Sequence, residues 1–199
     1  MKIAIISSSV RANRDGARVA LFTKNILETK NWETTLLDPM ELDFPLLTLM
    51  YKQMTNPEEK YKTVHKILDE ADGFVLVTAE YNHSVPPALK NLLDYYREEY
   101  YWKPSGIISY SSGPFGGVRA TEHLRNICAE LKCLAIPTSL PISKVHESIN
   151  EDGTSVNGDY ERRAKKFLDE FEWYLEALKN ISGNATGEKI IEYFEQYKN

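Results

Sequence analysis

The sequence contains little cysteine, no block of like charge and no long apolar run. Its two cysteines, Cys128 and Cys133, have no companion cysteines. Their spacing fits neither a zinc site nor a disulfide framework, and it predicts two buried thiols. The formal net charge is −5 over 199 residues, and lysines and arginines are spread along the chain, so nucleic acid is not expected as a partner. No apolar run approaches the roughly 20 residues that cross a bilayer, so no membrane partner is expected.

Targeting and nucleotide motifs are scarce as well. The apolar stretch at residues 1–6 is too short for a secretory signal, and a polar, arginine-bearing loop follows it directly. We therefore expect a cytoplasmic protein. The chain lacks GxxxxGK[ST], which excludes a nucleoside-triphosphate P-loop, and it lacks GxGxxG. Asp38 could mimic the ribose ligand of a Rossmann fold, but this signal is weak without the glycines.

Apolar, β-branched runs alternate with segments of helical periodicity along the chain. Strands are predicted at 2–8, 33–38, 73–78, 106–111 and 134–140. Helices are predicted at 15–30, 56–70, 87–96 and 159–179, with another that follows 116–120 and reaches Leu131; Asn56 and Pro57 are expected to start the second helix, and 39–45 is expected to be a loop. This alternation predicts an α/β fold with a doubly wound, five-stranded parallel sheet in the flavodoxin-like order 2-1-3-4-5, with helices on both faces.

We expect residues 1–180 to form one flavodoxin-like domain and residues 181–199 a C-terminal extension. Residues 188–198 have the pattern of a short amphipathic helix, whose aromatic face would cover either its own core or a partner subunit. The aromatic pairs Tyr95-Tyr96 and Tyr100-Tyr101-Trp102 fit either a subunit surface or the core.

The loop after the first predicted strand has the composition of a phosphate site. It offers three serine hydroxyls at 7–9 and three arginines, Arg11, Arg14 and Arg18. It also leads into a helix, whose first amides are free donors at the positive end of the dipole. Several donors with cationic compensation suit a phosphate dianion. The alternative is a polar connection with solvated arginines.

Two further loops follow predicted strands three and four. Residues 79–91 place polar, aromatic and proline residues before a helix, and residues 111–119 contain three glycines that permit close backbone approach to a flat ligand. In a parallel sheet all three loops lie along one edge. Together they outline a phosphate site joined to a planar, polar-edged site, which is the shape of FMN.

The same loops carry a family resemblance. The chain resembles the NADPH-dependent FMN reductase family of flavodoxin-like quinone, azo-dye and chromate reductases, over residues 2–140. Ser9-Val10-Arg11 followed by Arg14-Asp15-Gly16 resembles the family's G-S-x-R phosphate loop, although Ser8 replaces the usual glycine. Residues 80–91 resemble its specific E-Y-N-x-S-x-P-x-x-L-K-N signature, with Ala79 where a proline is common, and residues 116–120 match its glycine-rich turn.

The resemblance implies an FMN site and its ligands. The implied cofactor-binding residues are Ser9, Arg11, Arg14, Gly16, Ala17 and Arg18 toward the phosphate, and Glu80, Tyr81, Asn82, Ser112, Gly113, Gly116, Gly117 and Arg119 toward the ring system. For Glu80, Lys90 and Asn91, loop bracing or helix capping is at least an equal alternative, and Arg119 could brace its loop. His83 is better explained as a bystander than as a proton donor, and His65, His123 and His146 receive no role. No metal and no catalytic side chain are expected.

The function implied is an FMN-dependent NAD(P)H oxidoreductase. NADPH or NADH would donate a hydride to the flavin, and a small-molecule acceptor such as a quinone, azo compound, chromate or free flavin would then be reduced by a ping-pong mechanism. The resemblance also implies a homodimer or homotetramer. One alternative is a flavodoxin-type electron carrier, which usually has a hydroxyl-rich T-x-T-G-x-T loop and strong acidity. Another is a flavin-free interaction domain on the same fold.

Overall fold

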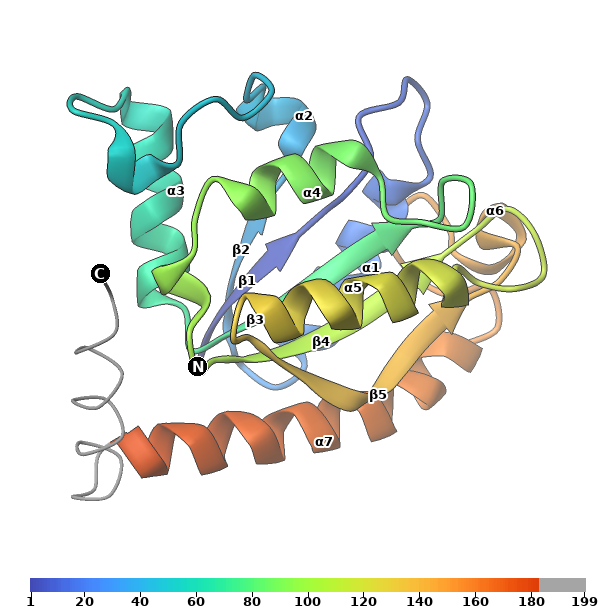
Figure 1. Cartoon of the computed structure of the whole chain (residues 1–199). Helices are drawn as coiled ribbons and strands as arrows, with labels where there is room; N and C mark the ends of the chain where they lie inside the picture. The colour runs from blue at the N-terminus through green and yellow to red at the C-terminus, as the bar shows by residue number, and fades with distance from the viewer. Residues whose placement is uncertain (183–199) are drawn as a thin grey trace.

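The computed structural model describes residues 1–182 and has a five-stranded parallel sheet at its centre (Figure 1). The strand order β2-β1-β3-β4-β5 confirms the predicted 2-1-3-4-5 arrangement. The strands are β1 (Lys2–Ile6), β2 (Glu33–Leu37), β3 (Gly73–Ala79), β4 (Pro104–Tyr110) and β5 (Leu134–Ile142). β3 and β4 are buried along their whole length, as expected for central parallel strands covered on both faces.

Two helical layers cover the sheet. Helices α1 (Gly16–Glu28) and α7 (Asp159–Ser182) contribute Phe22 and Phe171 to a core on one face. Helices α3 (Glu59–Glu70), α4 (Pro87–Asp94) and α5 (Val118–Glu130) pack on the other face, where Leu68, Leu92 and Leu124 lie in a second core. Successive strand residues alternate between the two cores because side chains in a strand point to opposite faces. Within residues 1–182, no helix is long and apolar enough to span a bilayer.

Several element boundaries differ from the prediction. The segment expected to be a loop at 39–45 contains a short helix, α2 (Pro39–Leu42), because the Asp38 carboxylate accepts a hydrogen bond from the Met40 amide and Pro39 occupies the first turn. Helix α3 begins at Glu59, with Glu58 as its N-cap residue, whereas the sequence predicted a start at Asn56. A further short helix, α6 (Val145–Ser148), was not predicted. The extension at 183–199, including the helix predicted at 188–198, lies outside the described residues.

The sequence did not decide whether the aromatic residues at 95–96 and 100–102 lie in the core or on a subunit surface. Three of these five residues, Tyr95, Tyr96 and Tyr100, lie in the core. Tyr95, Tyr96 and Tyr100 are each at most 2% exposed, whereas Trp102 is 40% exposed. The Tyr95 and Tyr96 hydroxyls donate to the carbonyls of Pro45 and Tyr61, at 2.9 Å in each case. Burial is the main reason why the pKa of Tyr95 is raised to about 12. Cys128 and Cys133 are free and buried, which confirms the prediction of two buried thiols.

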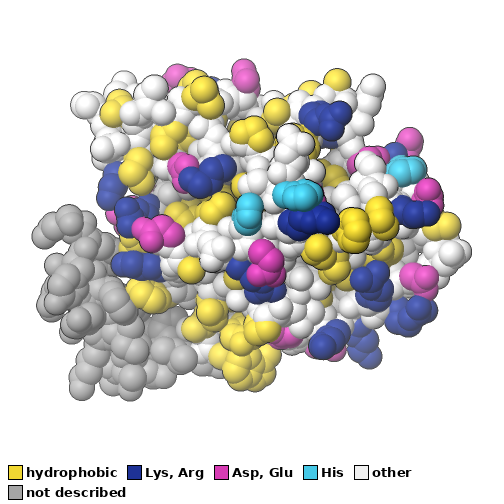
Figure 2. All heavy atoms as spheres, turned by 45° about the vertical axis from the view of Figure 1, so that its right-hand side comes forward, with side chains coloured by type: hydrophobic (Ala, Val, Ile, Leu, Met, Phe, Trp, Pro, Cys, Tyr) yellow, Lys and Arg dark blue, Asp and Glu magenta, His cyan; other side chains and the backbone are white. Residues whose placement is uncertain are grey.

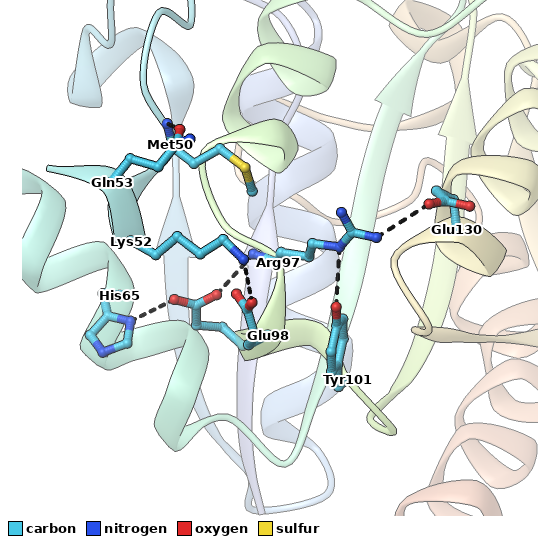
Figure 3. A network of polar contacts seen from close by, with 9 residues as sticks. Met50, Lys52, Gln53, His65, Arg97, Glu98, Tyr101 and Glu130 are labelled. Atoms are coloured by element: carbon cyan, nitrogen blue, oxygen red, sulfur yellow. Dashed lines mark hydrogen bonds and ion pairs between the residues drawn. The ribbon is translucent and has the colours of Figure 1, made fainter. Parts of the chain in front are cut away.

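A polar network fixes the turn after α4, and it gives His65 a partner that the sequence did not reveal (Figure 3). His65 Nδ1 lies 2.7 Å from Oε1 of the buried Glu99, and the His65 ring stacks on Tyr51. Lys52 Nζ lies 2.7 Å from Glu98 Oε1. These contacts attach the 3-10 turn η1 (Tyr51–Gln53) to η2 (Glu98–Tyr100), two segments far apart in the sequence.

The packing of α7 on β4 gives a stability prediction. A Cβ added at Gly106 would lie 2.3 Å from Phe167 Cζ, and Phe167 is fully buried. We expect Gly106→Ala to lower the free energy of unfolding by about 1–3 kcal/mol, as overpacked cores do. Chemical denaturation would measure it. Gly113→Ala is the matched control, because nothing lies within 4 Å of a Cβ there; an equal loss in both variants would contradict the prediction.

Candidate functional site

Three loops meet where β1, β3 and β4 end, and they enclose a cleft of about 210 Å³. Parallel strands bring their carboxyl ends to the same edge of a sheet, which is the usual ligand-binding edge of open α/β folds. Figure 2 shows basic, acidic and histidine side chains dispersed among hydrophobic ones over one face of the molecule. The described residues that line the cleft are Ser9, Arg11, Ala12, Asn13, Arg14, Asp15, Ala79, Glu80, Tyr81, Tyr110, Ser111 and Ser112.

Six of the fourteen predicted ligands line this cleft. They are Ser9, Arg11, Arg14, Glu80, Tyr81 and Ser112. The other eight stand in the same loops or in the first turns of α1 and α5 but do not line it; they are Gly16, Ala17, Arg18, Asn82, Gly113, Gly116, Gly117 and Arg119. The structure therefore brings the three predicted loops together, while the role of each residue toward a ligand stays a prediction.

The loop after β1 is a cradle of buried hydroxyls and helix amides. Ser7, Ser8 and Ser9 are all buried. Ser9 Oγ lies 2.6 Å from Tyr81 Oη, and Ser8 Oγ accepts a hydrogen bond from the Ala79 amide, so the first two loops are tied together. The side chain of Asp15, the N-cap residue of α1, makes no capping hydrogen bond. The first amides of α1 thus remain available to an anion.

The three arginines of this loop have different partners. Arg14 forms a two-armed ion pair with Asp38 and also donates to the Ser9 carbonyl. Arg18 lies 3.4 Å from the Asp15 carboxylate and donates to the Ile149 carbonyl at 3.0 Å. Arg11 is exposed, forms no ion pair with any described residue, and places its guanidinium 5.7 Å from the centre of the Tyr81 ring. Arg11 is therefore the arginine of this loop whose charge remains uncompensated by a carboxylate.

The loop after β3 turns tightly through Asn82 and His83. The Tyr81 and Ser84 backbones exchange two hydrogen bonds, of 2.9 and 3.0 Å, and both central residues have positive φ, 48° and 67°. This is the geometry of a two-residue hairpin turn, and both Asn and His are enriched among non-glycine residues with positive φ. His123 Nδ1 lies 3.0 Å from Ser84 Oγ and supports the turn. The turn points Asn82 and His83 outward and leaves Tyr81 at the cleft.

Glu80 and Arg119 form an ion pair that links the loop after β3 to the start of α5. The Glu80 carboxylate accepts hydrogen bonds from the Arg119 amide at 3.1 Å and from its guanidinium at 2.9 Å, so it caps the start of α5. These contacts are the bracing that the sequence left open as an alternative, and the part that either residue plays toward a ligand stays a prediction. The Asn91 side chain bonds the backbone of Pro45 and Leu47, and Lys90 pairs with Asp94 one turn along α4.

The loop after β4 contains two glycines in the left-handed backbone conformation. Gly116 and Gly117 have φ of 64° and 78°. A Cβ on Gly117 would lie 2.9 Å from the Tyr110 carbonyl oxygen, so a side chain there would collide with the end of β4. Ser111 Oγ donates to the Gly113 carbonyl at 3.0 Å and narrows the turn. The glycines therefore let the backbone of this loop pass close to the ends of β4 and β5.

Tyr110 is a cleft residue that the sequence interpretation missed. Its hydroxyl is buried and has no hydrogen-bond partner of ordinary geometry among the described residues. It lies 2.4 Å from where a Cβ on Gly16 would stand, so only glycine fits at the start of α1. Burial is the main reason why the pKa of Tyr110 is raised well above its ordinary value, and the group stays a neutral donor. The sequence feature that could have identified Tyr110 is a tyrosine at the last position of a buried strand, next to the ligand-binding edge of the sheet.

The fold and the three-loop cleft define a flavodoxin-like α/β protein with a ligand site at the carboxyl edge of its sheet. Among solved structures, the chain is similar to the flavoenzyme NAD(P)H:(acceptor) oxidoreductase FerB from Paracoccus denitrificans, with a TM-score of 0.73 and 19% identity over 88% of this chain and 97% of that one. A flavodoxin mutant from Pseudomonas aeruginosa has a TM-score of 0.53 and 20% identity over 88% of this chain and 99% of that one. At these identities the likeness shows the fold.

Sequence comparison places the chain more narrowly. The family model for NADPH-dependent FMN reductase matches residues 1–147, and the chain belongs to that family. It is 30% identical over 183 residues to a 2-hydroxy-1,4-benzoquinone reductase of Burkholderia sp, covering 86% of this chain and 94% of the relative. It is 31% identical over 180 residues to the FMN-dependent NADPH-azoreductase of Staphylococcus aureus, covering 85% and 93%. The family resemblance inferred from the loops is confirmed.

The unpaired Tyr110 hydroxyl can be tested without any ligand. A buried hydroxyl without a partner costs about 1–3 kcal/mol of desolvation, so we expect Tyr110→Phe to keep or raise the free energy of unfolding, by about 1 kcal/mol. Tyr100→Phe is the matched control, because its buried hydroxyl is also unpaired and lies far from the cleft. Denaturant unfolding of both variants measures the effect. A loss of stability confined to Tyr110→Phe would mean that its hydroxyl is bonded in the folded protein.

Proposed function

We propose that this protein is an FMN-dependent NAD(P)H oxidoreductase that reduces small-molecule acceptors such as quinones, azo compounds, chromate or free flavin. The observation that carries the proposal is that Ser9 and the uncompensated Arg11 line the same cleft as Tyr81 and Ser112, directly before the uncapped first turn of α1. Family membership supports the same activity.

The residues present fit an FMN. Ser9, Arg11 and the α1 amides at Gly16 and Ala17 would hold the phosphate, because a dianion needs several donors and positive charge. Arg14 would support them by fixing the Ser9 carbonyl and compensating Asp38. The backbone of 80–82, the Tyr81 ring, and the backbone of 112–117 would line the ring system. The buried Tyr110 hydroxyl, which lacks a partner, is a donor that a bound ligand would satisfy.

When bound, FMN supplies the hydride chemistry: overall, NADPH, a proton and a quinone become NADP⁺ and a hydroquinone. The chain's own contribution is positioning and charge. Backbone amides of the glycine loop would offset negative charge that grows at the pyrimidine end of the ring on reduction. Entry of donor and acceptor at the same face in turn would give ping-pong kinetics. A homodimer or homotetramer and a cytoplasmic location remain predictions.

Arg11 offers a direct test of the cofactor site. We expect purified protein to be yellow, or to become so with added FMN, and Arg11→Ala to weaken FMN binding about 10- to 100-fold, since a hydrogen bond to a charged group is worth about 1.5–3 kcal/mol. Quenching of FMN fluorescence measures the affinity. Lys66→Ala is the control, because Lys66 is an exposed cation on α3 away from the cleft. A protein that stays colourless and cannot be reconstituted contradicts the proposal.

A second experiment separates the reductase from a flavodoxin-type carrier on the same fold. A carrier binds FMN but has no site for a nicotinamide. We expect anaerobic stopped-flow mixing of the FMN-loaded protein with NADPH or NADH to bleach the flavin absorption rapidly with at least one donor. FMN binding without bleaching by either donor would favour the carrier. Protein whose melting temperature does not respond to FMN would favour the flavin-free interaction domain.

A further inference from the structure

Two cysteine thiols lie together at the amino edge of the sheet, which is the edge opposite the cleft. Cys128 is in the last turn of α5, and Cys133 directly precedes β5, the strand at one side of the sheet (Figure 1). Both thiols are free and buried, since Cys128 is 1% and Cys133 4% exposed. We call these two residues the thiol pair.

The end of α5 brings the thiol pair together. The Cys133 amide donates to the Cys128 carbonyl at 2.9 Å, and the next bond joins the Lys132 amide to the Ala129 carbonyl at 3.1 Å. Lys132 has a φ of 53°. Two such bonds around a left-handed residue form a Schellman motif, in which the side chains at the positions of the two cysteines commonly contact each other. The backbone bond also keeps their Cα atoms within the roughly 7 Å that a disulfide can bridge.

Hydrogen bonds join the two sulfurs to each other and to one hydroxyl. The Cys133 thiol donates to the Cys128 sulfur, and this bond is the main reason why the pKa of Cys128 is lowered. The same bond and burial raise the pKa of Cys133. Ser105 Oγ donates to Cys128 Sγ at 3.7 Å and also interacts with the Cys133 thiol. Two sulfurs that share a proton and a hydroxyl lie close enough for a bond to form between them after a small side-chain movement.

A lysine beside the thiol pair supplies positive charge. Lys103 Nζ donates to the carbonyls of Leu68 and Asp69, at 2.7 Å in each case, so the ammonium is fixed at the end of α3. Its charge favours a negative charge on the Cys133 sulfur. The thiolate is the form of cysteine that oxidants attack, and a nearby lysine promotes it. Cys128 accepts two hydrogen bonds and would react first, and Cys133 would follow with the help of Lys103.

The helix end provides the route by which a small oxidant reaches the pair. Cysteines buried in apolar surroundings are inert, but these two lie at the end of a helix, where local opening is frequent. Lys132 occupies the left-handed position that glycine usually takes, which lowers the stability of this turn. Opening of the last turn of α5 would therefore expose both sulfurs without unfolding the sheet.

We propose that Cys128 and Cys133 form a redox site, which hydrogen peroxide oxidises to an intramolecular disulfide and which thiols reduce again. The Cys128 thiolate attacks one peroxide oxygen, the O–O bond breaks, and the departing hydroxide takes up a proton, which leaves a sulfenic acid and water. The Cys133 sulfur then attacks the Cys128 sulfur, the S–O bond breaks, and a second water leaves with the Cys133 proton. Overall, two thiols lose two electrons and two protons, and the peroxide becomes two waters. This inference does not depend on the proposed function.

The sequence allows a direct test, because trypsin cleaves after Lys132, between the two cysteines. The native full-length protein is treated with hydrogen peroxide, its remaining thiols are blocked with N-ethylmaleimide, and it is digested without a reductant. We expect mass spectrometry to find residues 126–132 and 133–144 joined in one peptide that dithiothreitol separates. We also expect the loss of both free thiols of the chain to accompany it. Two blocked, unlinked cysteines would overturn the proposal, as would a disulfide found only between two chains.

Two matched variants test which cysteine reacts first. Dimedone, which traps sulfenic acids, should label Cys128 of Cys133→Ser after peroxide treatment. It should label Cys133 of Cys128→Ser about 10-fold less, as a pKa difference of one unit predicts for the thiolate fraction. Equal labelling of the two variants would overturn the assignment of Cys128 as the nucleophile. The digest of the wild-type protein tests the disulfide itself and does not require either variant to fold.

Discussion

The ion pair between Arg14 and Asp38 is the interaction on which the site most depends. Each side chain is only 12% exposed, and the two arms of the guanidinium meet both carboxylate oxygens. The same carboxylate caps α2 through the Met40 amide, and the same guanidinium holds the Ser9 carbonyl. One pair therefore fixes the loop after β1, the end of β2 and the start of α2 together. Removing one partner of such a buried pair would leave an uncompensated charge, which typically costs several kcal/mol.

This arrangement divides the polar side chains into those that support the site and those that remain free to bind. Arg14, Arg18, Glu80 and Arg119 are occupied by ion pairs. What remains is the Arg11 charge and the Tyr110 hydroxyl among the cleft residues, and the uncapped first amides of α1 next to them in the chain. A site with few free groups on a braced frame is preorganised, so binding need not order the loops first.

The sequence was sufficient for the sheet and for the three loops, for identifiable reasons. The β-branched runs at Ile3–Ile6 and Phe74–Val77 have no competing pattern, and alternation with helices leaves a parallel sheet as the simple solution. The features that the sequence did not predict depend on contacts between residues far apart in the chain. His65 meets Glu99 across 34 positions, and Asn91 meets Leu47 across 44. Neither spacing has a local signature, and the unpaired state of Tyr110 depends on how α1 packs over β4.

The two ends of the motif at residues 80–91 have different structural roles. Its first part, Glu80 and Tyr81, lies at the cleft, but its last residue does not. Asn91 lies one turn into α4. Its side-chain amide accepts a hydrogen bond from the Leu47 amide and donates one to the Pro45 carbonyl. A substitution there would leave the cleft residues in place and release the backbone on either side of Leu46. The motif therefore builds two structures in one segment: the wall of the cleft at its start, and at its end the anchor of the segment around Leu46.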